Sequence, residues 1–155
     1  LIYQVAGRAG RGETPGEVVI QTYLPEHDLY RHLLERGYRD FISSLLQQRQ
    51  QVSLPPYSFM ALLNAESKQY DKAVSFLSEM KQKLSSNQCD GIDVWGPVPA
   101  PLPKRRDLYR CQLLVKSASR TALQSAVSSL VHGSKTALRS RYVRWSVDID
   151  PLDML

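Results

Sequence analysis

Two adjacent prolines, Pro55 and Pro56, separate this 155-residue chain into parts with different patterns. Proline has no backbone N–H and pushes the preceding residue towards an extended conformation, so a helix cannot continue through the pair. Before the prolines, an apolar run at Val18–Tyr23 predicts a buried strand, and apolar residues at helical spacing predict helices around Leu29–Leu34 and Phe41–Leu46. We therefore expect a domain boundary at about residue 54, between parts 1–53 and 54–155.

After the prolines, strand and helix patterns alternate in the order βαββαβ. That order predicts an α+β, ferredoxin-like domain, in which two helices cover one face of an antiparallel four-stranded sheet. The expected strands are Tyr57–Ala65, a short one around Ile92–Gly96, Tyr109–Lys116 and Trp145–Ile149. Ser67 is expected to cap the first helix, whose apolar face comprises Tyr70, Ala73, Val74, Leu77, Met80 or Lys81, and Leu84. The second helix presents Ala122, Leu123, Ala126, Val127, Leu130 and Val131.

Positive charge is concentrated in the second part of the chain. Between Pro97 and Trp145 there are ten basic residues and one acid, Asp107, so this window carries net +9 while the whole chain carries +5. A concentrated excess of this kind predicts a polyanionic partner, with nucleic-acid phosphates as the first candidate. The alternative is the solvated face of a protein with a high isoelectric point.

Alternating prolines precede the most basic stretch. Prolines at positions 97, 99, 101 and 103 stiffen the chain into an extended strand or a polyproline II arm. A stiff arm would hold cations outward with little entropy left to lose, which suits a nucleic-acid backbone; the alternative is a rigid loop with a basic tip. The residues we expect to contact DNA are Lys104, Arg105, Arg106 and Arg110.

A second candidate subsite lies in the second predicted helix, where Arg120 and Gln124 are four residues apart and share one face. An arginine in the first helical turn faces the positive end of the helix dipole, which is unfavourable unless an anion binds there. A docked carboxylate would be held by Arg120, Gln124 and free backbone N–H groups.

Residues 4–12 read Q-V-A-G-R-A-G-R-G, which resembles the last conserved motif of superfamily 2 helicases. The resemblance implies that Arg11 acts as an arginine finger towards the γ-phosphate of ATP, with Arg8 beside it and Gln4 as a polar contact. Gly10 would let the backbone approach the nucleotide closely. The alternative is a flexible basic loop, because a lone glycine pattern is weak evidence.

The motif is only half of an ATP site. The chain contains no G-x-x-x-x-G-K-[ST] loop for the phosphates and no acidic box for magnesium. We therefore expect this chain to be a fragment, with ATP and Mg²⁺ bound mainly by residues outside it.

Six strings occur in order along the chain: Q-V-A-G-R-A-G-R-G, G-E-V-V-I-Q-T, L-P-P-Y, W-G-P-V-P-A-P, L-Y-R-C-Q-L-L-V-K and V-D-I-D-P. Together they resemble the C-terminal part of the primosomal protein N′ (PriA) family. These are bacterial 3′ to 5′ DNA helicases that restart stalled replication forks. The resemblance implies that residues 1–53 end the second RecA-like lobe and that residues 54–155 form a domain similar to ribosomal protein S10. Lys104–Asp107 only loosely match the family's basic loop, which leaves individual DNA contacts open.

The same resemblance implies partners and a location. The domain is expected to contact forked and single-stranded DNA, other primosome proteins, and the acidic C-terminal tail of single-stranded DNA-binding protein through Arg120 and Gln124. The family's zinc-binding cysteines lie upstream, so zinc is expected only in the full-length protein. The expected location is the bacterial cytoplasm, associated with the nucleoid.

Two rival readings remain. A non-enzymatic, ferredoxin-like RNA-binding module would carry a K/R-G-F/Y-G/A-F-V-x-F/Y string, which does not occur here. A carboxylate-dependent nuclease would be built on Asp148, Asp150 and Asp153, but these acids fit better as residues that flank the end of a strand stopped by Pro151. Cys89 and Cys111 lack metal-binding spacing and are expected to be reduced thiols, and no stretch is long and apolar enough to span a membrane.

Overall fold

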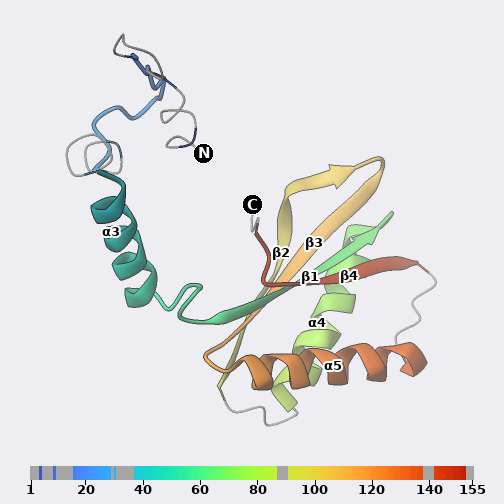
Figure 1. Cartoon of the computed structure of the whole chain (residues 1–155). Helices are drawn as coiled ribbons and strands as arrows, with labels where there is room; N and C mark the ends of the chain where they lie inside the picture. Colours follow the sequence, from blue (N-terminus) through green and yellow to red (C-terminus); the bar gives the residue numbers. More distant parts are fainter. Residues whose placement is uncertain are drawn as a thin grey trace. The chain divides into compact units, whose positions relative to one another are not determined.

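The computed structural model describes Gln4, Ala9, residues 16–28, Tyr30, and residues 37–86, 91–137 and 142–152. The chain divides into two compact units, Leu1–Gln48 and Arg49–Leu155 (Figure 1). This division falls a few residues before the predicted boundary. The assignment of residues 1–53 to a RecA-like lobe stays a prediction.

The predicted strand at Val18–Tyr23 is wrong. These residues form no strand, and Val19 and Tyr23 are 83% and 103% exposed. An apolar, β-branched run has only a propensity to form a strand. The strand itself also requires a neighbouring strand that pairs with its backbone N–H and C=O groups and packing that buries its side chains. No strand occurs among the described residues of the first unit, so the run has no partner there.

The helix predicted around Phe41–Leu46 is confirmed as α3, Gly37–Gln51. It begins at Gly37, whose φ of +77° is readily adopted only by glycine. No residue of α3 is fully buried. Leu29, Leu33 and Leu34, which predicted the preceding helix, lie outside the described residues.

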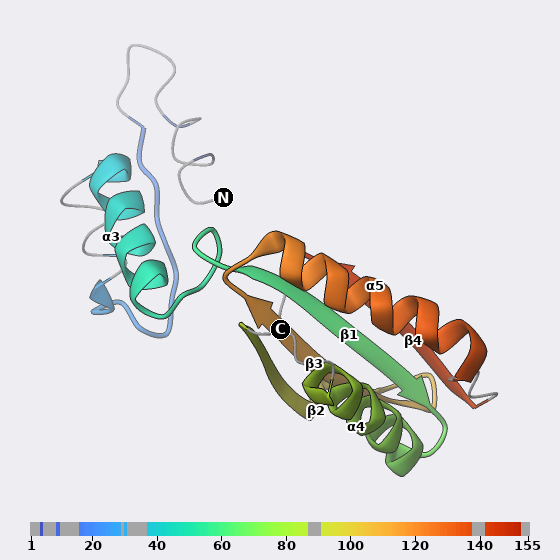
Figure 2. The same cartoon turned by 90° about the horizontal axis from the view of Figure 1, so that it is seen from below.

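The second unit has the predicted α+β fold. Its strands form one antiparallel sheet in the order β2-β3-β1-β4, the ferredoxin-like arrangement, and Figures 1 and 2 show both helices on the same face of that sheet. The elements are β1 (Phe59–Ser67), α4 (Tyr70–Ser86), β2 (Ile92–Arg105), β3 (Leu108–Ser117), α5 (Arg120–Ala137) and β4 (Val143–Ile149).

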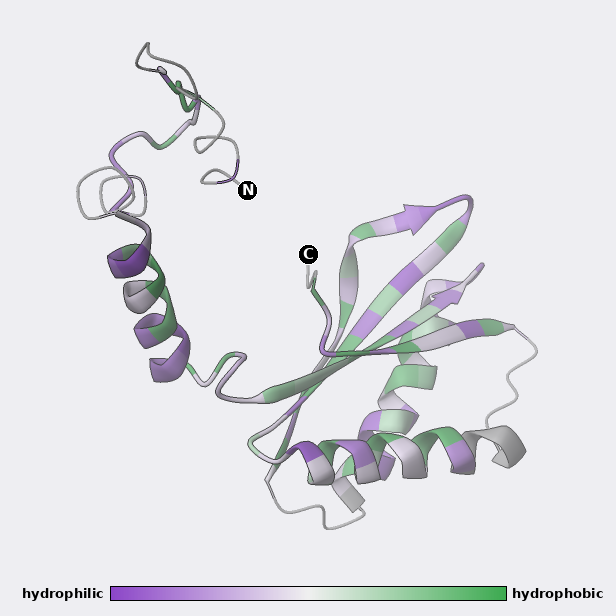
Figure 3. Cartoon of the chain, in the orientation of Figure 1, coloured by the Kyte–Doolittle hydropathy of each residue, from purple (hydrophilic) through white to green (hydrophobic). Residues whose placement is uncertain are grey.

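The core lies between the sheet and the two helices. Alternate strand residues point into it, and Figure 3 shows this alternation as green and purple bands along β3. On α4, Met80 and not Lys81 completes the buried face, whereas Tyr70 at its start is 42% exposed. Each fully buried leucine or methionine stabilises the fold by about 1.5–3 kcal/mol. The buried residues include Ala61, Leu63, Leu77, Leu113, Val115, Leu123, Ala126 and Leu130.

The proline-rich segment continues β2 as an extended strand. The short strand expected around Ile92–Gly96 therefore runs on to Arg105 and pairs with β3. The register shifts between Trp95 and Val98 and again between Pro99 and Lys104. Because prolines cannot donate to the ladder, such shifts are the usual way to accommodate them in a strand.

Candidate nucleic-acid interface

The face of the sheet opposite the helices, here called the second face, carries most of the polar strand residues. The register places these residues in rows across the sheet, since paired residues point to the same side. Two buried residues, Met60 and Leu62, lie among them. The rows are Asp93, Lys116 and Met60; Trp95, Leu114, Leu62 and Asp148; Val98, Gln112, Asn64 and Ser146; and Arg110, Glu66 and Arg144.

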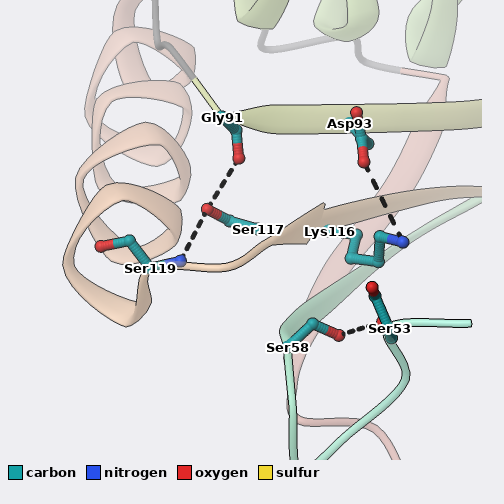
Figure 4. Close-up of polar contacts among 7 residues, drawn as sticks. All are labelled: Ser53, Ser58, Gly91, Asp93, Lys116, Ser117 and Ser119. Atoms are coloured by element: carbon teal, nitrogen blue, oxygen red, sulfur yellow. Dashed lines mark hydrogen bonds and ion pairs between the residues drawn. The ribbon is translucent and has the colours of Figure 1, made fainter. Parts of the chain in front are cut away.

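Several cations of the second face already have carboxylate partners. Arg110 Nε lies 3.0 Å from Glu66 Oε1, although this buried nitrogen makes no well-aligned hydrogen bond. Lys116 Nζ lies 4.0 Å from Asp93 Oδ2 (Figure 4) and 4.7 Å from the centre of the Trp95 ring. With only 12% of its side chain exposed, Lys116 has little surface to offer an outside anion.

The four predicted DNA contacts gather on the β2–β3 hairpin but differ in their surroundings. Lys104 Nζ lies 3.4 Å from Asp107 Oδ1, and Arg110 is paired with Glu66. Arg105 and Arg106 are exposed and have no ion pair with any described residue. The hairpin turns at Arg106 and Asp107, whose φ values of +49° and +62° lie in the left-handed region.

A cleft of about 810 Å³ lies beside the hairpin tip, where the sheet register brings three strand ends together. Ser67, the last residue of β1, pairs with both Tyr109 and Val143, so the residues beyond it meet the start of β3 and of β4. Glu66 and Tyr142 also line the cleft. We call it the cationic cleft after its four basic residues, Lys68, Lys72, Arg106 and Arg144.

Sequence reasoning missed most of the cationic cleft. Of its basic residues only Arg106 was a predicted contact, and Arg144 was merely counted in the basic window. Lys68 and Lys72 lie outside that window, and Tyr142 was not considered. Lys68 and Lys72 are four residues apart, but no spacing in the sequence links this pair to Arg106 or Arg144. The fold brings the three sites to the same end of the sheet.

The predicted partner-tail residues lie at the start of α5. Arg120 Nη2 is 2.8 Å from Asp150 Oδ2, and both side chains are partly exposed, at 59% and 43%. Gln124, one turn further along, is exposed. The carboxylate of Asp150 thus already lies beside Arg120, where the sequence predicted the carboxylate of a docked partner.

The start of α5 is capped from within the chain. Ser119 Oγ accepts a hydrogen bond from the N–H of Ala122 at 3.3 Å, as an N-cap residue does. Ser117 Oγ accepts one from the N–H of Ser119 at 3.1 Å and donates to the carbonyl of Gly91 at 2.9 Å (Figure 4). One N–H group expected to be available to a carboxylate is therefore satisfied.

The residues predicted to meet ATP are mostly beyond what the structure describes. Arg8, Gly10 and Arg11 lie outside the described residues, and Gln4 is exposed.

Cys111 is buried, and burial raises the pKa of its thiol, which disfavours the thiolate needed for nucleophilic attack or metal binding.

Two of the remaining sequence candidates, Cys89 and Asp153, also lie outside the described residues. Within the described ranges there is no group of three or more potential metal ligands. Nor does any helix in those ranges have the length and apolarity to cross a membrane.

Residues 50–152 match the family model described as "Primosomal protein N C-terminal domain". Three curated relatives all carry the name "Replication restart protein PriA". The protein from Haemophilus influenzae is 40% identical over 99% of this chain and 21% of its own length. Those from Bacillus subtilis and Synechocystis sp. are 30% and 32% identical, over 100% and 97% of this chain and 19% and 18% of their own lengths. The chain thus spans about a fifth of these relatives.

Proposed function

The chain belongs to the primosomal protein N C-terminal domain family, and we propose that its second unit binds nucleic acid and a protein partner within a replication restart helicase. The proposal combines the family with the distribution of charge on the fold. The names of the relatives support a role in replication restart. In this proposal the full-length protein works on DNA in the bacterial cytoplasm, at the nucleoid.

The observation that carries the nucleic-acid part is the gathering of exposed cations at one end of the sheet. Arg105, Arg106 and Arg144 are exposed there, and none has an ion pair with a described residue. Exposed cations that are not neutralised within the chain attract a polyanion, and the release of its counterions favours binding. Paired cations such as Arg110 contribute less, because an incoming phosphate must compete with Glu66.

The test is the salt dependence of binding by the 155-residue chain. Fluorescence anisotropy with labelled forked, single-stranded and duplex oligonucleotides should show affinity that falls as salt rises from roughly 50 to 200 mM. For single strands the slope of log K against log salt should be about −0.7 for each phosphate contacted. Excess polyglutamate serves as a competitor control, since it offers charge without phosphates or bases. Absence of binding at low salt, or complete displacement by polyglutamate, would reject the proposal.

We also propose that Arg120 and Gln124 receive the C-terminal carboxylate of the tail of single-stranded DNA-binding protein. Both side chains are accessible, and Arg120 lies in the first turn of α5, where the helix dipole favours an anion. Its pair with Asp150 is solvent-exposed, and exposed pairs are worth only about 0–1 kcal/mol. A tail carboxylate can therefore displace Asp150 at small cost.

For the N-terminal motif, the proposal keeps Arg11 as the arginine finger, Arg8 as its neighbour, and Gln4 and Gly10 as contacts near the nucleotide. Support comes from the Q-x-x-G-R-x-G-R-G string and from the relatives that match the whole chain. ATP and Mg²⁺ would be held mainly by residues outside this chain. Zinc would likewise be bound elsewhere in the full-length protein.

A further inference from the structure

We propose that the cationic cleft holds the backbone of an unpaired nucleic-acid strand and that the ring of Tyr142 receives one of its bases. This inference rests on the proposed nucleic-acid function and assigns a particular strand type to a particular place. The cleft lies next to the hairpin tip but includes residues of β1, α4 and β4.

The charge balance of the cleft leaves four cations to be compensated. Glu66 is the only acid among the lining residues, so the lining carries net +3. That carboxylate lies 3.0 Å from Arg110 Nε, outside the lining of the cleft, and is neutralised by it. Lys68, Lys72, Arg106 and Arg144 are exposed and form no ion pair with the described residues.

The kinds of cation suit phosphodiesters. Arg106 and Arg144 each present a planar fork of N–H donors that matches two phosphate oxygens. Lys68 and Lys72 add point charges on flexible stems. The volume of about 810 Å³ falls in the range of sites that enclose a ligand of drug size, and it therefore has room for a nucleotide with its flanking phosphates.

Tyr142 is the reason to choose an unpaired strand over a duplex. Its side chain is 67% exposed at the rim of the cleft, and Lys72 Nζ lies 4.2 Å from the ring centre. An aromatic ring among cations is the recurring arrangement for single strands, because every unpaired base has a face that can stack. In a duplex the bases are already stacked and are not available to a surface ring.

The backbone at Arg106 is a further reason to regard the cleft as a binding site. A φ of +49° is unfavourable for an arginine and is commonly occupied by glycine, asparagine or aspartate in hairpin turns. The turn thus carries a strained cation where an unstrained residue would serve the hairpin better. Strain of this kind is typical of functional positions, and here the strained residue lines the cleft.

The test compares four variants of the 155-residue chain in binding to a labelled oligothymidine and to a blunt duplex. Lys72→Ala should weaken binding to the single strand several-fold and make the salt slope shallower by about 0.7, the value for one lost phosphate contact. Lys83→Ala is the matched control, because it removes the same charge from the same helix, three turns away from the cleft.

Tyr142→Ala should weaken single-strand binding roughly tenfold, as expected for one lost base stack, with little effect on the duplex. Tyr142→Phe should retain the affinity, because it keeps the aromatic face. Circular dichroism and urea unfolding of each variant check that the domain remains folded.

The outcomes separate this inference from the proposed function. If the unmodified chain binds nucleic acid with the expected salt dependence, but Lys72→Ala matches Lys83→Ala and Tyr142→Ala binds single strands normally, the cleft assignment is overturned and the general function stands. If the unmodified chain does not bind nucleic acid at all, the proposed function fails and this inference fails with it.

Discussion

Arg120 meets a carboxylate at the start of α5, but that carboxylate belongs to Asp150 of the same chain. The helical spacing of Arg120 and Gln124 was visible in the sequence, and so was the preference of this position for an anion. The partner was not visible, because Asp150 follows β4 and is brought to α5 only by the fold. The sequence around a residue therefore indicates which groups its side chain can bind, but not which group of the same chain already binds it.

Replacing Asp150 tests whether it competes with a docked tail. Asp150→Asn removes the internal carboxylate, so the affinity for a tail peptide with a free C-terminus should rise several-fold, whereas Arg120→Ala should largely abolish binding. Isothermal titration calorimetry measures both. Asp148→Asn is the control, since Asp148 is an exposed acid near the end of β4, two residues before Asp150. Equal affinities for Asp150→Asn and the unmodified chain, together with binding by Arg120→Ala, would contradict the assignment.

Among the confirmed elements, β2 departs most from its predicted bounds. The residues around Gly96 were expected to end a short strand, with either an extended or a polyproline II arm after it. Instead, the short strand and the proline-rich segment after it form one long strand that pairs with β3, with two register shifts along its length. A pairing register depends on the partner strand, so it could not be read from the prolines alone.

Gly96 marks the first of these shifts, and its replacement should be costly. Its φ is +108°, and an added Cβ would lie 2.8 Å from the carbonyl oxygen of Gln112. Gly96→Ala should therefore lower the free energy of unfolding by about 1–3 kcal/mol. Urea denaturation followed by tryptophan fluorescence measures the change.

Gly91→Ala is the matched control for this substitution. Gly91 also has a positive φ, +81°, but an added Cβ would meet nothing within 4 Å. Only the conformational cost should appear, about 1 kcal/mol. A loss at Gly91 as large as that at Gly96 would show that the contact with Gln112 is unimportant.

The two ends of the chain show why some elements were predicted and others were not. In the second unit, strand and helix patterns agree with a complete sheet, and all four predicted strands and both helices are confirmed, with altered bounds. The run at Val18–Tyr23 has an equally clear strand pattern but no described strand to pair with, and it forms none. An apolar pattern typical of a strand therefore predicts a strand reliably only where a neighbouring strand can pair with it.

For the whole molecule, the order of elements was sufficient to predict the fold but not the site. A βαββαβ succession has few compact solutions, and the observed sheet order is the expected one. The cationic cleft could not be predicted in the same way. Lys68 and Arg144 are far apart in sequence, and they meet because β1 ends beside the start of β4.

The motif at residues 4–12 can be tested only in the full-length protein, because its proposed role needs a second lobe. Arg11→Ala should reduce DNA-stimulated ATP hydrolysis by a factor of about 10³ or more, since an arginine finger compensates charge on the transferring phosphoryl group. DNA binding should be unaffected. Phosphate-release assays and anisotropy on the same preparation measure the two properties, and near-normal hydrolysis would reject the assignment.

The sheet order also decides where a mechanical load would enter the domain. The segment leading from α3 continues directly into β1, which lies inside the sheet with β3 on one side and β4 on the other. Tension transmitted along that segment would act on a strand held along both flanks, so two ladders of hydrogen bonds would have to yield together. A pull on this connection would therefore be shared by both neighbours of β1 rather than by one edge of the sheet.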